Sequence, residues 1–259
     1  MSRKVLCTDL DNTLIYSYKH NIGIDKRNVE LYQGREISFI TEKTYGLLKK
    51  IRESMLIIPT TTRTAEQYDR IDLGVGGFAF ALVCNGGILL RGGVRDEDWY
   101  RESLARIEES MTELERAIRF LEQDARRKFE IRFIENLFVF TKCSCPDMSV
   151  RELTEYLNPR YVDVFHNGEK VYVVPAGLSK GTAIDRIRPY LDAEMIYAAG
   201  DSAFDVSMLD RADAAFAPYG FSSRYGLGRN VREFGGNVIF SDAFLEACLF
   251  SLDEKEVGV

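Results

Sequence analysis

The sequence has few of the features that mark secreted, membrane-spanning and metal-cluster proteins. Its five cysteines, Cys7, Cys84, Cys143, Cys145 and Cys248, are an odd and scattered set, so they predict no disulfide framework. Only two histidines are present, and they do not complete a zinc-binding set with Cys143 and Cys145. No apolar stretch approaches the roughly 20 residues needed to span a bilayer. We therefore expect a cytoplasmic protein in a reducing compartment, with no membrane partner.

A clustered basic surface is also missing. The formal net charge is −6, and no run of lysine and arginine offers a footprint for a phosphate backbone, so no nucleic-acid partner is expected. The 259 residues, 46% hydrophobic and 29% charged, are typical of a soluble globular protein. This length suits one large α/β domain or a core domain with a smaller module. We expect a monomer or a homodimer.

The first part of the chain alternates strands and a helix. The run Lys4–Thr8 is short and apolar and leads into acidic residues, which predicts a buried strand that ends in a loop of carboxylates. A helix is predicted over Thr41–Ser54, followed by a strand over Met55–Ile58. A third strand, Phe78–Cys84, ends at the turn residues Asn85-Gly86-Gly87. Helix followed by strand indicates a parallel crossover, and we place a domain boundary at Gly87.

The segment 87–174 has a different pattern. It opens with one long amphipathic helix, and two predicted hairpins follow with a shorter helix between them. The second hairpin flanks Asn167-Gly168, a pair suited to the positive φ angles of a tight turn. This order predicts an antiparallel sheet with helices on one face. The apolar stripe of the long helix is Leu104, Ile107, Met111, Leu114, Ile118 and Leu121, the hairpins are 129–142 and 161–174, and the shorter helix is 148–157.

After Pro175 the alternating pattern returns. A helix is predicted from Lys180 to about Arg188, ended by Pro189, and the strand Met195–Ala199 follows. Another helix begins near Ala203, and the segments 214–217 and 237–240 are candidate final strands. The fold class is therefore α/β, with a Rossmann-like parallel-sheet core made of 1–86 and 175–259. An α+β domain, 87–174, is inserted into it.

Two carboxylates follow the first predicted strand in Asp9-Leu10-Asp11-Asn12-Thr13. Because alternate residues of an extended segment point the same way, Asp9 and Asp11 can face one site. One carboxylate can attack phosphorus while the other gives a proton to the leaving oxygen. A solvated turn or a calcium-like loop would have a similar sequence.

Three further short motifs offer parts needed for phosphoryl transfer. Pro59-Thr60-Thr61-Thr62-Arg63 follows the second strand, where hydroxyls and N–H groups can hold phosphate oxygens, although a helix N-cap favours the same residues. Lys180 stands at a helix start and can neutralise charge on a phosphate, or it is a solvated surface lysine. Asp201 and Asp205, four apart after a strand, can ligate Mg²⁺, or they cap a helix.

The order and placement of these motifs resemble the haloacid dehalogenase superfamily. The resemblance rests on D-L-D-N-T, T-T-R, S-K-G and G-D-S-A-F-D, and it covers the core domain. The position of the insert, between the second and third motifs, is similar to the capped branch with sucrose-phosphatase-like, Cof-like and phosphomannomutase-like proteins. The chain departs from the pattern twice, with Thr62 where many relatives have glycine and Phe204 where they often have asparagine.

The resemblance implies roles for individual positions. Asp9 matches the nucleophile that becomes an aspartyl-phosphate, Asp11 the general acid and base, and Lys180 the cation on the transferring group. The implied cofactor is Mg²⁺, held by the Asp9 carboxylate, the Asp11 backbone carbonyl and Asp201, with Asp205 as a further ligand or anchor. The candidate substrate-binding residues are Thr61, Thr62, Arg63 and Asn85.

Three functions fit this pattern, because a fold alone does not fix function. The first is a Mg²⁺-dependent phosphatase that hydrolyses a small phosphate monoester, with sugar phosphates among the candidates. The second is a phosphosugar mutase, which shares the aspartyl-phosphate but returns the phosphoryl group to a sugar. The third is a non-catalytic module that binds a phosphorylated ligand, although such a module would be expected to have lost Asp9, Asp11 or Asp201. The expected partner is a small phosphorylated metabolite.

Overall fold

The computed structural model describes residues 3–256 and divides the chain into two compact units. The core unit consists of the chain before Asp96 and after Ser179, and the insert unit is Asp96–Ser179. The chain therefore leaves one unit, builds the other and returns. The predicted fold class, a parallel-sheet core with an inserted α+β unit, is confirmed.

A five-stranded parallel sheet lies at the centre of the core unit, in the order β15-β14-β13-β1-β5. From β1 the chain first adds β5 on one side and later adds β13 on the other. The strand order therefore reverses beside β1, and open α/β sheets bind their ligands at the carboxyl ends of the strands around such a point. The strands are β1 (Lys4–Thr8), β5 (Leu56–Pro59), β13 (Met195–Ala199), β14 (Ala214–Pro218) and β15 (Val231–Phe234).

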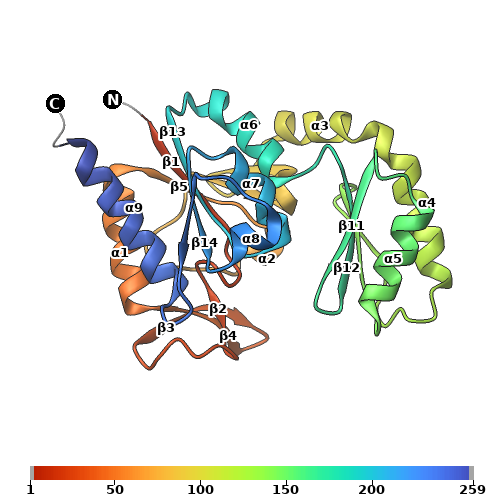
Figure 1. Ribbon diagram of the computed structural model, residues 1–259, viewed down its shortest axis with the longest axis horizontal. Coiled ribbons are helices and arrows are strands. Elements are labelled where there is room, and N and C mark those ends of the chain that lie inside the picture. Colours follow the sequence, from red (N-terminus) through yellow and green to blue (C-terminus); the bar gives the residue numbers. More distant parts are fainter. Residues whose placement is uncertain (1–2, 257–259) are drawn as a thin grey trace. The chain divides into compact units, whose positions relative to one another are not determined.

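Helices cover both faces of this sheet (Figure 1). On one face α1 and α9 pack against the strands through a buried cluster that includes Leu48, Tyr197 and Phe244. On the other face lie α6 and α7. The helices of the core unit are α1 (Glu42–Ser54), α2 (Ala65–Tyr68), α6 (Lys180–Leu191), η3 (Ala203–Asp205), α7 (Val206–Arg211), α8 (Phe221–Tyr225) and α9 (Phe240–Glu256).

A small antiparallel sheet that was not predicted from the sequence lies between β1 and α1 in the chain. Its strands are β2 (Tyr16–Ser17), β3 (Lys26–Tyr32) and β4 (Arg35–Thr41), in the order β2-β4-β3. We call it the N-terminal sheet. Gln33 and Gly34 turn the chain between β3 and β4, both with positive φ angles of 50° and 74°. This is the conformation of a tight hairpin turn.

The core unit extends beyond the turn at which we predicted the domain boundary. After β6 (Phe80–Val83) and the short helix η1 (Cys84–Gly86), the chain pairs back as β7 (Ile88–Arg91) and β8 (Val94–Arg95). A bridge between Thr60 and Leu82 ties β6 to the end of β5. Because this hairpin is completed inside the core unit, the insert unit begins at Asp96 instead of Gly87, and it ends at Ser179 instead of Val174.

The insert unit is a four-stranded antiparallel sheet in the order β11-β12-β10-β9, with α4 and α5 packed on one face. Leu114, Leu153, Val139 and Val173 meet in its buried cluster. Helix, hairpin, helix and hairpin follow one another as predicted. The elements are α3 (Glu97–Arg106), η2 (Glu108–Ser110), α4 (Met111–Gln123), β9 (Arg132–Ile134), β10 (Phe138–Lys142), α5 (Pro146–Tyr156), β11 (Val162–Asn167) and β12 (Lys170–Pro175).

Three predictions of secondary structure were wrong. The long helix of the insert is divided, because Ile107 leaves the helical region with φ −105° and ψ 4°. Pro189 does not end α6, which continues to Leu191; a proline in the last turn disturbs few hydrogen bonds. The last strand is Val231–Phe234, whereas residues 237–239 form no strand and α9 begins at Phe240.

All five cysteines are free, and Cys145 alone among them is not buried. This agrees with the prediction of no disulfide framework. None of the described helices is long and apolar enough to cross a membrane.

Candidate active site

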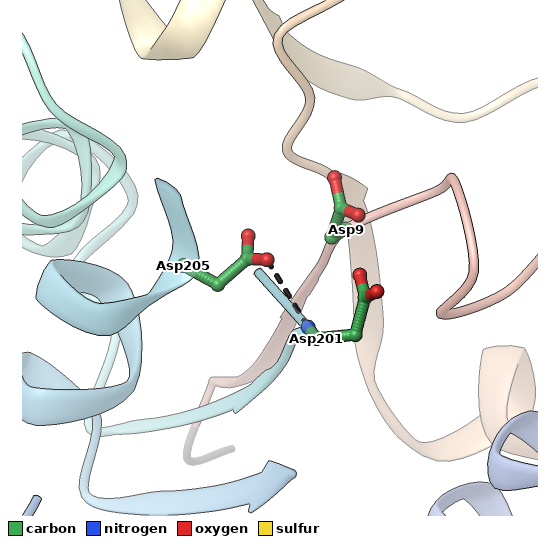
Figure 2. Close-up of side chains that lie close together, drawn as sticks. All are labelled: Asp9, Asp201 and Asp205. Carbon is green, nitrogen blue, oxygen red and sulfur yellow. Dashed lines mark hydrogen bonds between the residues drawn. The ribbon is translucent and has the colours of Figure 1, made fainter. Parts of the chain in front are cut away.

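Two neighbouring strands of the central sheet bring Asp9 and Asp201 together (Figure 2). Thr8, the last residue of β1, is paired with Ala199, the last residue of β13. The backbone N–H of Asp9 then donates to the carbonyl of Ala199 over 2.9 Å. Asp201 follows two residues after Ala199, so both carboxylates lie at the same edge of the sheet. The side chain of Asp9 is 9% exposed.

Lys180, the first residue of α6, lies between two of the carboxylates. Its Nζ atom donates to Oδ1 of Asp9 and to Oδ1 of Asp205, each over 2.6 Å. The side chain of Lys180 is 1% exposed. It is therefore a buried cation with two anionic partners, and the interpretation as a solvated surface lysine is wrong.

Asp205 fixes the loop that carries Asp201. Its Oδ2 atom accepts hydrogen bonds from the backbone N–H groups of Asp201 and Ser202 and from the hydroxyl of Ser202, over 3.1, 2.9 and 2.8 Å. Figure 2 shows the first of these bonds. Gly200 is required at this bend, because a Cβ atom there would overlap Cβ and Cγ of Asp205. Thr13 also contacts the cluster, through a 3.2 Å hydrogen bond from its hydroxyl to Asp201.

The three carboxylates form the acidic cluster expected of a metal site. Oxygen atoms of Asp9, Asp201 and Asp205 all lie within 4.8 Å of one another. Burial and the charges of Asp205 and Asp11 raise the pKa of Asp201 to about 7, although the hydroxyl of Thr13 and the charge of Lys180 lower it. Burial also raises the pKa of Asp9 well above its ordinary value, against the opposing charge of Lys180. Burial and the repulsion between the carboxylates therefore disfavour the fully ionised form of the cluster, even with Lys180 beside it.

Thr61, Thr62 and Asn85 come from the loops that follow β5 and β6. Thr61 is fully buried, and its hydroxyl accepts a 3.1 Å hydrogen bond from the N–H of Arg63, so its own O–H is the group with which it can donate. Thr62 is half-buried. Asn85 is buried with a positive φ of 58°, and its N–H donates to the carbonyl of Thr61 over 2.9 Å. The N-cap of α2 is Thr64, so Thr61 and Thr62 are not the capping residues.

Arg63 and Asp11 contact each other directly. Arg63 donates from Nε to Oδ2 of Asp11 over 2.8 Å and from Nη2 to Oδ1 over 2.7 Å. Arg63 also binds Glu30 of β3, whose side chain is fully buried. Sequence reasoning missed Glu30, because it left residues 16–40 without an interpretation. The apolar runs on either side of Gln33-Gly34 are the signal that would have predicted this hairpin.

The sequence matches the model of the haloacid dehalogenase-like hydrolase family over residues 93–218. The match includes Lys180, Asp201 and Asp205, whereas Asp9, Asp11 and Thr61 precede it. Among curated protein sequences, no match to this chain was found.

Solved structures with similar folds cover nearly the whole chain. The sucrose-phosphatase of Synechocystis sp. PCC6803, solved with sucrose and phosphate, has a TM-score of 0.69 at 17% identity over 96% of this chain and 98% of its own. A sugar phosphatase of HAD subclass IIB has a TM-score of 0.59 at 15% identity, over 94% of this chain and 97% of its own. The IMP-nucleotidase of Plasmodium falciparum has a TM-score of 0.58 at 12% identity, over 96% of this chain and 68% of its own.

The family match over residues 93–218 and the similar folds agree with the predicted superfamily and enzyme class, a haloacid dehalogenase-like hydrolase.

Proposed function

We propose that the protein is a Mg²⁺-dependent phosphatase that hydrolyses a small phosphate monoester through an aspartyl-phosphate on Asp9. The observation that carries this proposal is the buried Lys180, which contacts both Asp9 and Asp205 beside Asp201 at the switch point of the sheet. Ion pairing often fails to repay the free energy that it costs to bury a lysine and its carboxylates, so such a cluster is weak evidence for a purely stabilising role. Titratable groups with strongly shifted pKa values are typical of catalytic sites.

In the proposed reaction Lys180 holds Oδ1 of Asp9, and Oδ2 attacks phosphorus. A bond forms between Oδ2 and phosphorus while the bond from phosphorus to the leaving oxygen breaks, and protonated Asp11 gives its proton to that oxygen. Asp11, now a carboxylate, next takes a proton from water as the water oxygen attacks phosphorus. Inorganic phosphate leaves, and Asp9 is restored.

The residues at the site fit a magnesium ion, because Mg²⁺ prefers carboxylate and carbonyl oxygens. We propose that the carboxylates of Asp9 and Asp201 and the backbone carbonyl of Asp11 would hold it. Asp205 already gives Oδ1 to Lys180 and Oδ2 to the loop, which favours its role as an anchor. When bound, Mg²⁺ would supply positive charge to the phosphoryl oxygens and help to orient them.

We propose that Thr61 and Asn85 contribute to phosphate binding, and that the insert unit is a cap that selects the leaving group. Sugar phosphates are the substrate class to test first, because two of the similar structures are a sucrose-phosphatase and a sugar phosphatase. Nucleotides are the second class, since another is an IMP-nucleotidase. A cytoplasmic location and a monomeric or homodimeric state stay predictions.

The test is a screen of the purified protein over sugar phosphates, nucleotides and small phosphorylated acids with Mg²⁺, with release of inorganic phosphate as the readout. Asp9→Asn is expected to remove nearly all turnover, because an amide is nearly isosteric but a far poorer nucleophile. The matched control is Asp98→Asn, an exposed aspartate of the insert unit. A variant that keeps more than about a tenth of wild-type turnover would exclude Asp9 as the nucleophile. Transfer of the phosphoryl group to a second sugar without phosphate release would instead indicate a mutase.

A further inference from the structure

A second charged network lies beside the Asp9 site, and its centre is the buried Glu30 of the N-terminal sheet. Glu30 accepts hydrogen bonds from Nη1 and Nη2 of Arg63 over 2.8 and 3.0 Å. It also accepts from Nε of Arg70 over 3.2 Å and from the hydroxyl of Ser38 over 2.6 Å. With no exposed side-chain surface and four such contacts, Glu30 is a fixed anchor for the guanidinium of Arg63.

The neighbouring edge of the guanidinium of Arg63 binds Asp11. Nε and Nη2 donate to the two carboxylate oxygens of Asp11, and Nη1 makes a longer 3.4 Å bond to the carbonyl of Gln67. A guanidinium has five N–H donors, and these contacts with Asp11, Glu30 and Gln67 use all of them. Arg63 therefore has no donor left for a phosphate group unless it gives up one of these bonds.

The two bonds from Arg63 restrict the side chain of Asp11. Asp11 is 51% exposed and directly precedes Asn12, where the chain bends with a φ of 61°. A half-exposed aspartate on a bend can adopt several rotamers, whereas two parallel N–H···O bonds from one guanidinium fix the plane of its carboxylate. Proton transfer is efficient only when the acid lies within hydrogen-bond reach of the leaving oxygen.

We propose that Arg63 is not a phosphate ligand but a positioning residue, which holds the carboxylate of Asp11 for its two proton transfers while Glu30 holds Arg63. This inference rests on the proposed function. In the first step, the bond between Asp9 and phosphorus forms, the bond to the leaving oxygen breaks, and the proton of Asp11 moves to that oxygen. The product is the Asp11 carboxylate, the form that accepts both bonds from Arg63. In the second step this carboxylate, still held, takes the proton of the attacking water.

Substrates whose leaving groups differ in their need for a proton distinguish between two roles of Arg63, the positioning of Asp11 and the binding of phosphate. Nitrophenolate leaves without protonation, whereas the alkoxide of glycerol phosphate leaves only with a proton. We expect Arg63→Gln to lower kcat/KM for glycerol phosphate about 100-fold and to lower it far less for p-nitrophenyl phosphate. Inhibition by inorganic phosphate is expected to stay as in the wild type. Arg63→Lys is expected to be intermediate, because a lysine keeps the charge but cannot bind both oxygens in one plane.

Glu30→Gln tests the anchor. We expect the same pattern with a smaller loss, because the amide can still accept a hydrogen bond but no longer attracts Arg63 by charge. The matched control is Arg27→Gln, since Arg27 makes a similar two-point contact with Glu42 at the surface of the same sheet. Arg27→Gln is expected to leave kcat/KM unchanged for both substrates. Circular dichroism and melting temperature establish that each variant is folded. If Arg63→Gln does not fold, Arg63→Lys takes its place in the comparison.

An equal loss on both substrates, with weaker inhibition by phosphate, would overturn the proposal and make Arg63 a phosphate ligand. Unchanged kinetics in the folded Arg63 variants would also overturn it and leave Arg63 a structural role. Both results leave the proposed function intact as long as wild-type turnover depends on Asp9. Turnover that survives in Asp9→Asn would overturn the proposed function itself.

Discussion

Removal of Lys180 tests whether the charges of the site are balanced in the way the structure indicates. At an effective dielectric constant of about 20, each 2.6 Å contact of Lys180 with Asp9 and Asp205 gains about 6 kcal/mol of Coulomb energy. The cost of burying the charges cancels much of this gain, and loss of one partner from a buried ion pair typically costs about 3–5 kcal/mol. The same range follows from the anions, because Asp9 and Asp205 within 4.8 Å repel each other by about 3 kcal/mol or more when both are ionised.

We therefore expect Lys180→Met to lower the free energy of unfolding by about 3–5 kcal/mol at neutral pH in the absence of metal. The loss is expected to shrink as the pH falls, because protonation of Asp9 and Asp201 removes the repulsion. The assay is urea unfolding in EDTA, followed by circular dichroism at several pH values. Lys43→Met is the matched control, since Lys43 makes a 3.0 Å ion pair with Glu246 at the surface, where such pairs contribute at most about 1 kcal/mol. If the two variants lose the same small amount, the charge balance that we infer is wrong.

Four further predictions concern the same site. Because the folded-state pKa of Asp201 is raised from 3.8 to about 7, its contribution to stability is present below pH 3.8 and is lost as the pH rises through 7. In EDTA the free energy of unfolding should fall by at most about 4 kcal/mol between pH 3.8 and 7, and the melting temperature should fall with it. A melting temperature that rises steadily over this pH range would contradict the prediction. EDTA should abolish activity and Mg²⁺ restore it, and full activity in metal-stripped protein would remove the metal from the mechanism. Gly200→Ala should displace Asp205 and lower turnover at least tenfold, whereas Gly235→Ala, with open space around it, should not; equal rates would refute the close approach. Replacement of residues 96–179 by a Gly/Ser linker should preserve hydrolysis of an aryl phosphate but remove selectivity among substrates, and a folded core that keeps the wild-type preference would place selectivity in the core loops.

Elements with a strong local signal were predictable from the sequence. The strands Lys4–Thr8 and Met195–Ala199 were predicted with the bounds that they have in the structure, because each is a short apolar run bounded by polar residues. The hairpin at Glu135 and Asn136 was also predicted, and both residues have positive φ angles. Signals of this kind depend on neighbours in the chain.

Elements whose form depends on packing were not predictable in the same way. The apolar stripe from Leu104 to Leu121 continues across Ile107, but the chain turns there so that α3 and α4 form separate helices. Strands β3 and β4 were not predicted, although apolar residues flank the turn at Gln33 and Gly34, because the exposed Leu31 and Tyr32 interrupt the alternation of buried and exposed positions. The register of β3 with β4 is also irregular around Glu30.

By itself the sequence determined the chemical groups of the site, because the acidic pair after β1, Lys180 at a helix start and the two aspartates after β13 are each local motifs. Only the tertiary structure decided which of these groups touch. Lys180 meets Asp9 across 171 residues of chain, since β1 and β13 are neighbours in the sheet. Arg63 likewise turns to Asp11 and Glu30 because the N-terminal sheet carries Glu30 to it. Local sequence sets the backbone and the donors, whereas a contact between distant side chains depends on strand order and on which buried charges find partners.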